Sequence, residues 1–284
     1  MAGDGSPLAS VAFGLVSAAS WGAGDFSGGL ATRRAPAAGV VIASQAVGVA
    51  VLVAVALVTG EAAPSAGQLW WAALAGANGA FGLLALYSAL ASGRMGIAAP
   101  ISGLVGAVVP VLAGMRLHGP PGALRLAGFA LALVGVWLLT AAGDSAERAR
   151  PRELVLPFLA GVSFGLFLVF IHRAGGSAIF WPLTTARATS MAVLAAIGVV
   201  TGTLRLPGRS AIGLTCLAGL LDTGGNAFFV LAAQAGRLDV AGVLSSLYPA
   251  STVALACLLL RERLTRRQGI GAVATLAAIG CVSS

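Results

Sequence analysis

Three charged side chains interrupt stretches of this sequence that are otherwise almost entirely apolar: Asp25, Arg187 and Asp222. A charge at the centre of a membrane-spanning helix costs about 2.5–3.5 kcal/mol on insertion scales, so each of these residues needs a partner or a water-filled cavity. Asp222 and Asn226 are four positions apart, as are Trp21 and Asp25, so each pair shares one face of a helix. We therefore expect Arg187 to meet a carboxylate or another polar group rather than lipid.

Two interpretations of these residues are open. In the first they form a buried ion pair or hydrogen-bond network that sets the register of the helices, or Asp25 and Arg187 only reach an interface with their polar ends. In the second they line a water-filled cavity that binds a solute, where a carboxylate could also carry a coupling proton. The candidate cavity residues are Trp21, Asp25, Arg187, Asp222, Asn226 and Tyr248, with Ser245 as a weaker candidate.

The elements that must position these residues are membrane-spanning helices. Hydrophobic residues make up 58% and charged residues only 9% of the 284 positions, which is unlike a soluble protein. Stretches of about 20 apolar residues, each long enough to cross about 30 Å of hydrocarbon, recur between short polar breaks. The sequence predicts an all-α polytopic membrane protein with ten spans, near residues 8–31, 38–58, 69–91, 95–114, 121–141, 153–172, 179–201, 211–235, 239–260 and 268–283.

The chain also contains an internal repeat. When Gly93-Arg94 is aligned with Gly236-Arg237, Ser102 meets Ser245, Gly128 meets Gly271, and Ser20-Trp21-Gly22 meets Ser163-Phe164-Gly165. We expect a first five-helix repeat over residues 1–142, a polar connection over 143–152 and a second repeat over 153–284. Five spans is an odd number, so the second repeat is expected to be inverted relative to the first, an arrangement that suits a transporter working by alternating access.

Two segments resemble a known family. The stretch from Leu247 to Gly280 is similar to the last two helices of an EamA domain of the drug/metabolite transporter superfamily, with a Pro near the helix start, Glu262 in the short connection, and a Gly-rich final helix. The stretch from Ser17 to Arg34 resembles the family's first helix, with its Trp-Gly pair. The resemblance implies a secondary carrier of small organic solutes such as metabolites, amino acids or drug-like compounds, often an exporter, in a bacterial plasma membrane. Glu262 has no acidic counterpart in the first copy, so we interpret it as an ion-pair partner of nearby arginines.

Other functions find less support in the sequence. All 17 basic Lys+Arg positions are arginine, which excludes a Schiff-base lysine and a Walker-type phosphate loop, and the basic balance is expected to meet lipid headgroups rather than nucleic acid. The three cysteines fall in apolar stretches without metal-ligand spacing, so neither a metal nor a cofactor is expected. The alternatives to a carrier are a duplicated scaffold without transport and, less favoured, an intramembrane enzyme that uses Asp25 and Asp222. The predicted partners are a small solute, the bilayer and a coupling proton, and the oligomeric state is open.

Orientation in the membrane is left open, because two arguments disagree. Most arginines lie in the odd-numbered connections between spans, and the positive-inside rule places those connections in the cytoplasm and both termini outside. The family resemblance suggests termini inside.

Overall fold

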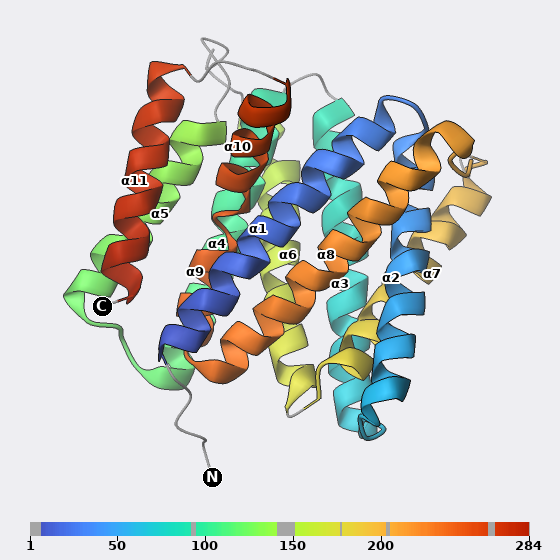
Figure 1. The fold of residues 1–284 in the computed structure, drawn as a ribbon, viewed down its shortest axis with the longest axis horizontal. Helices are drawn as coiled ribbons and strands as arrows, with labels where there is room; N and C mark the ends of the chain where they lie inside the picture. The colour runs from blue at the N-terminus through green and yellow to red at the C-terminus, as the bar shows by residue number, and fades with distance from the viewer. Residues whose placement is uncertain are drawn as a thin grey trace.

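The computed structural model describes residues 7–91, 95–140, 151–176, 178–202, 205–260 and 265–283, and within these ranges every regular element is a helix. The helices are α1 Pro7–Thr32, α2 Ala37–Thr59, α3 Ala66–Ala91, α4 Met95–His118, α5 Ala123–Thr140, α6 Pro151–Gly175, α7 Phe180–Val200, α8 Arg209–Ala235, α9 Leu238–Ser245, α10 Tyr248–Leu260 and α11 Arg266–Ser283 (Figure 1). The predicted all-α class is confirmed for this part of the chain. Residues 143–150 of the predicted connection, and Glu262 with Arg261, lie outside the described residues.

Eight stretches within the described ranges are long and apolar enough to cross a membrane. They correspond to the first four predicted spans and to spans six to nine. Of the remaining two, α5 has a shorter apolar stretch, Ala123–Leu139, and α11 begins with the polar run Arg266-Arg267-Gln268. The protein is thus an integral membrane protein, while ten complete spans stay a prediction.

The ninth predicted span is broken in the structure, which corrects the expectation of one continuous helix over 239–260. The first helix of this span, α9, ends at Ser245, and α10 begins at Tyr248. Pro249 explains the break, because it lacks the N–H that would bond to the carbonyl of Ser245 and its ring crowds that carbonyl. Leu247 N–H instead closes a tighter turn onto Leu244 O at 3.2 Å. Pro110 leaves α4 continuous, so a proline in these helices does not always end a helix.

Helix pairing follows the internal repeat. The most extensive contacts of α1 are with α8, and those of α6, which occupies the equivalent position in the second half, are with α3. α2 packs on α8 as α7 packs on α3. α5 lies beside α11 at one side of the bundle (Figure 1). Exchanging the two halves therefore leaves the principal pattern of helix contacts unchanged.

The two main helix pairs are antiparallel. Ser10 Oγ donates to Ala232 O and Ser17 Oγ to Gly225 O, each at 2.8 Å, which orders α1 against α8. In the other pair, Gln68 Nε2 donates to Gly175 O at 3.4 Å. α1 starts at the edge of the molecule where α6 ends (Figure 1), so the first helices of the two halves run in opposite directions.

Candidate functional site

A cavity of about 800 Å³ lies between the two halves. Its walls come from α1, α2, α3, α4, α6, α7 and α8, and from the break between α9 and α10. Thr32 and Ala37 line it, so the cavity extends to the turn that joins α1 to α2. Its volume is within the range of pockets that hold small organic molecules.

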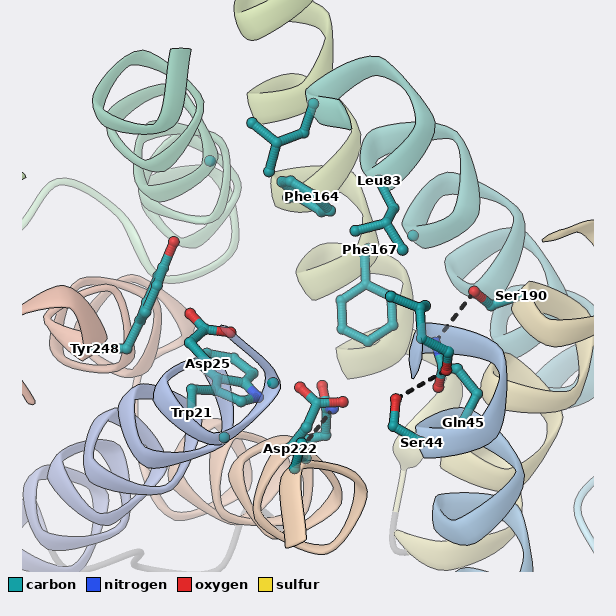
Figure 2. Close-up of a pocket in the computed structure, with 18 of the residues that line it drawn as sticks. Trp21, Asp25, Ser44, Gln45, Leu83, Phe164, Phe167, Ser190, Asp222 and Tyr248 are labelled. Atoms are coloured by element: carbon teal, nitrogen blue, oxygen red, sulfur yellow. Dashed lines mark hydrogen bonds between the residues drawn. The ribbon is translucent and has the colours of Figure 1, made fainter. Parts of the chain in front are cut away.

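All six residues that the sequence singled out line this one cavity. Figure 2 shows Trp21, Asp25 and Tyr248 together on one side of it and Asp222 nearby. Ser245 is wrong as a cavity candidate, because it is completely buried in α9 and does not line the cavity. What the six residues bind stays a prediction.

Arg187 is an ion-pair partner and does not face lipid, as expected. Its guanidinium donates from Nη2 to Asp222 Oδ2 at 2.5 Å and from Nη1 to Gln45 Oε1 at 2.6 Å. Gln45 in turn donates through Nε2 to Ser190 Oγ at 3.4 Å. The Arg187 side chain is only 5% exposed, whereas that of Asp222 is 47% exposed, so the carboxylate presents the pair to the cavity. The network ties α2, α7 and α8 together.

Gly48 makes the space that Arg187 occupies. A Cβ at this position of α2 would lie 2.5 Å from Thr223 Oγ1 and 3.0 Å from both Cδ and Nη1 of Arg187. These distances are shorter than van der Waals contact, so the guanidinium could not stay in place beside a larger residue. The absence of a side chain at position 48 is therefore part of the ion-pair site.

An aromatic group stands beside the two carboxylates. The Trp21 ring stacks on Phe229, with ring centroids 6.0 Å apart, and meets Tyr248 edge to face at 6.4 Å and 86°. Gly225 of α8 lies directly under the Trp21 ring, and a Cβ there would overlap it. Packing on these neighbours holds the indole at the cavity wall, one helical turn before Asp25.

The side chains of Asp25 and Asn226 differ in their hydrogen bonding. Asp25 is exposed and lines the cavity, and no hydrogen bond or ion pair joins its carboxylate to any residue in the described ranges. Asn226 is buried and donates through Nδ2 to Asp222 O of its own helix at 2.9 Å. The amide therefore stabilises α8 near the ion pair, and Asp25 is the carboxylate available to a ligand.

Sequence reasoning missed Gln45, Ser190 and an apolar wall made of Leu83, Phe164, Phe167 and Leu168. Gln45 was detectable as a lone amide in an apolar span, by the same criterion that selected Arg187. Phe164 was detectable as the residue aligned with Trp21. Leu83, Phe164 and Phe167 lie across the cavity from Asp25 and Tyr248 (Figure 2). The other three residues of this wall show no signal in the sequence, because apolar residues are the norm in these helices.

At the opposite end of the bundle, which we call the closed end, none of the described lining residues of the cavity comes from the turns between helices, and backbone and ionic contacts join the helix ends. Arg237 donates to His118 O at 3.2 Å, to Gly119 O at 2.8 Å and to Asp239 Oδ2 at 2.7 Å. The hydrogen bond to Asp239, which is fully buried, raises the pKa of the Arg237 guanidinium above its ordinary value. These contacts fasten the start of α9 to the end of α4.

Glu61 caps α7 at the same end. Its Oε1 accepts the N–H of Ile179 at 2.6 Å, and its Oε2 accepts those of Phe180 at 2.9 Å and Trp181 at 2.7 Å. A carboxylate at a helix N-terminus satisfies free N–H groups and interacts favourably with the helix dipole. The second half is thereby anchored to the end of α2. Among the described residues, no three His, Cys, Asp or Glu side chains gather closely enough to hold a metal ion.

Comparisons with known proteins identify a related solved structure and a family. A solved structure described only as "Crystal structure of protein" superposes with a TM-score of 0.81 over 96% of this chain and 95% of its own, at 18% identity, which shows a shared fold. No curated protein matches the sequence. The model of the EamA-like transporter family matches twice, over residues 8–141 and 152–284. The two matches cover nearly the whole chain, and the protein belongs to the EamA-like transporter family.

Proposed function

We propose that this protein is a secondary carrier that moves a small organic solute through the cavity by alternating access, without changing the solute chemically. The observation that carries the proposal is the cavity of about 800 Å³ between two repeats, which extends to one end of the bundle and has no described lining residue in the turns at the closed end. Charged residues inside membrane-spanning helices are costly, and those that occur usually line a solute pathway or form a structural ion pair. Here Asp222, whose side chain is 47% exposed, and Asp25, which is also exposed, both line the cavity.

The helix arrangement supports alternating access. The contacts of α1 with α8 and of α6 with α3 exchange when the halves are exchanged. We propose that the halves are inverted five-helix repeats, so that the conformation closed at the opposite end has the same architecture with the roles of the repeats reversed. In that conformation the contacts of Ser10 and Arg237 separate, and the turn between α1 and α2 closes.

Export is the direction that the family resemblance implies, and protons are the proposed coupling ions. A proton or a cationic solute that reaches Asp222 must compete with Arg187 for the same carboxylate. Such competition would connect solute binding to helix position, because Arg187 lies on α7 and Asp222 on α8.

Transport is tested first by comparing the metabolites retained by cells with and without the protein, and then by reconstituting the protein into lipid vesicles with the solutes found. A carrier accumulates or exchanges the solute unchanged, an enzyme changes it, and a scaffold does neither. Loss of unchanged-solute movement in Arg187→Gln vesicles at equal protein amount supports the cavity as the pathway. Equal movement in that variant contradicts it.

Alternating access is tested by thiol labelling in a background in which the three native cysteines are replaced. Gly29→Cys at the cavity and Ser10→Cys at the closed end are labelled with a membrane-impermeant maleimide from each side. An alternating carrier exposes position 29 on one side and position 10 on the other, although Ser10 is only 2% exposed in this conformation. A static scaffold never exposes position 10.

A further inference from the structure

Among the described residues that line the cavity, negative side chains outnumber positive ones by one. Asp25, Asp222 and Arg187 are its charged lining residues. Arg187 is neutralised by Asp222 at 2.5 Å, and nothing in the described part of the chain pairs with Asp25. An unpaired carboxylate inside a membrane-spanning bundle is costly. A ligand that brings one positive charge would remove this cost.

The surroundings of Asp25 suit an organic cation. Trp21 precedes it by one turn on α1, and the edge-to-face contact of Trp21 with Tyr248 at 6.4 Å places two aromatic rings beside the carboxylate. Figure 2 shows these three side chains on the same side of the cavity. Aromatic faces attract cations, and proteins use this attraction to recognise quaternary ammonium groups.

The opposite wall suits an apolar body. It is formed by Leu83 of α3 and by Phe164, Phe167 and Leu168 of α6. Leu168 is the repeat counterpart of Asp25 and Phe164 that of Trp21, where a repeat counterpart is the residue that occupies the equivalent position when Gly93 is aligned with Gly236. The same two positions of the repeat thus carry a charge and an indole on one wall, and a leucine and a phenyl ring on the other.

An anionic group has no comparable partner. Arg187 is 5% exposed, its two terminal nitrogens are engaged by Asp222 and Gln45, and its Nε is buried. A carboxylate on the ligand would have to displace Asp222, which already pairs with that guanidinium. The site therefore disfavours both anions and zwitterions.

We propose that the cavity binds amphipathic organic monocations, with the cationic group held by Asp25 between Trp21 and Tyr248 and the apolar body against Leu83, Phe164 and Phe167. The inference names the substrate class of the carrier and rests on the proposed function only in its claim that the bound cation is moved. Binding itself is a property of this cavity whether or not the halves alternate.

The test uses three benzyl compounds of matched shape: benzyltrimethylammonium, its neutral tert-butyl analogue neopentylbenzene, and the anion phenylmethanesulfonate. Radiolabelled benzyltrimethylammonium is equilibrated with the protein in lipid nanodiscs, with empty discs as the blank, and the other two compounds serve as competitors. Because the ammonium is permanent, its charge is the same at every pH. The same labelled cation is then used for exchange across proteoliposomes.

We expect saturable cation binding that neither competitor displaces efficiently. Asp25→Asn should weaken it on the order of 10- to 100-fold, because a charge-assisted contact is lost. Trp21→Leu should weaken it about two- to fivefold. Asp25→Glu restores the charge and should retain most of the binding, which separates a recognition role from a folding defect. The matched control is Asp144→Asn, which removes the same charge from the polar connection of the sequence and should have no effect.

Equal binding to wild type and Asp25→Asn, efficient competition by the neutral or anionic analogue, or no saturable binding of the cation would overturn the inference. Asp25-dependent binding without any exchange across vesicles would keep the cation site and contradict the carrier function. Exchange of other solutes without a preference for the cation would keep the carrier function and contradict the cation site.

Discussion

Replacement of Gly48 by alanine tests whether the ion pair depends on the space beside α2. The added Cβ would lie 2.5 Å from Thr223 Oγ1 and 3.0 Å from Arg187 Cδ and Nη1. Arg187 must then retreat, yet its Nη1 is held to Gln45 Oε1 at 2.6 Å and its Nη2 to Asp222. Overpacking of this kind costs about 1–3 kcal/mol. We expect reduced thermal stability and a loss of transport that exceeds the loss of folded protein.

Gly213→Ala is the matched control, because Gly213 is also a helical glycine and its added Cβ would have no neighbour within 4 Å. Alanine is favoured over glycine inside a helix by up to about 1 kcal/mol, so this variant should be as stable as wild type or more so. Both substitutions add one methyl group, but Gly48→Ala is expected to lower the stability of the protein and Gly213→Ala to leave it unchanged or raise it. Thermal unfolding of the detergent-solubilised protein and exchange across vesicles measure them side by side.

A double-mutant cycle assigns the effect to a contact. Thr223→Ala removes the oxygen nearest to the new Cβ, so Gly48→Ala with Thr223→Ala should be less damaging than the sum of the two single changes, by at least about 0.5 kcal/mol. If Gly48→Ala behaves like Gly213→Ala, the reasoning that Gly48 makes room for Arg187 is refuted. An additive cycle would show that the contact with Thr223 does not contribute and would leave Arg187 as the residue that the new Cβ displaces.

Three further predictions concern the carboxylates. Asp222→Asn should reduce transport much more than it reduces folded protein; if Asp222 carries the coupling proton, exchange down a gradient persists while pH-driven accumulation is lost, and unchanged kinetics across pH would leave it only structural. Glu61→Ala should lower the free energy of unfolding by about 1–2 kcal/mol through loss of the α7 cap, with Glu61→Gln intermediate, and a calorimetric result equal to wild type would contradict the cap. Asp239→Asn removes the buried anion beside Arg237, so maleimide should label Ser10→Cys faster than in the same background with Asp239 intact; equal rates would show that this pair does not hold the end closed.

The helical class, the repeat and most spans could be predicted because they depend on composition and on a repeated pattern. Each apolar stretch must satisfy its own backbone hydrogen bonds in lipid, so a helix is the only local solution. The sequence indicates that Pro249 interrupts the hydrogen-bond ladder of its span, but it does not show that the helix ends there, since α4 stays continuous through Pro110. Whether a proline ends a helix depends on tertiary contacts, and those are invisible along the chain.

The charged candidates could be predicted because charges inside apolar spans are costly and therefore rare. A carboxylate or guanidinium in an apolar span is rare enough to be noticed, and pairing of Arg187 with one of the carboxylates follows from the need to neutralise it. The choice between Asp25 and Asp222 as its partner was not predictable, because it depends on how α1, α7 and α8 cross. Gly48 was equally hidden, since this chain contains 40 glycines and only its neighbours distinguish it.

The charges of the cavity break the symmetry of the fold that holds them. The repeat counterparts of Asp25, Arg187 and Asp222 are Leu168, Ser44 and Gly79, and all three of these uncharged residues line the same cavity. Equivalent positions of both repeats therefore face one site, while the ionic chemistry comes only from α1, α7 and α8. If the halves exchange roles during transport, the site itself does not move from one repeat to the other; the same three charges meet the solute from both sides of the membrane. Placing Asp at position 168 in an Asp25→Asn background would move the carboxylate to the opposite wall, and recovery of cation exchange in that variant would show that the duplicated scaffold accepts the charge from either repeat.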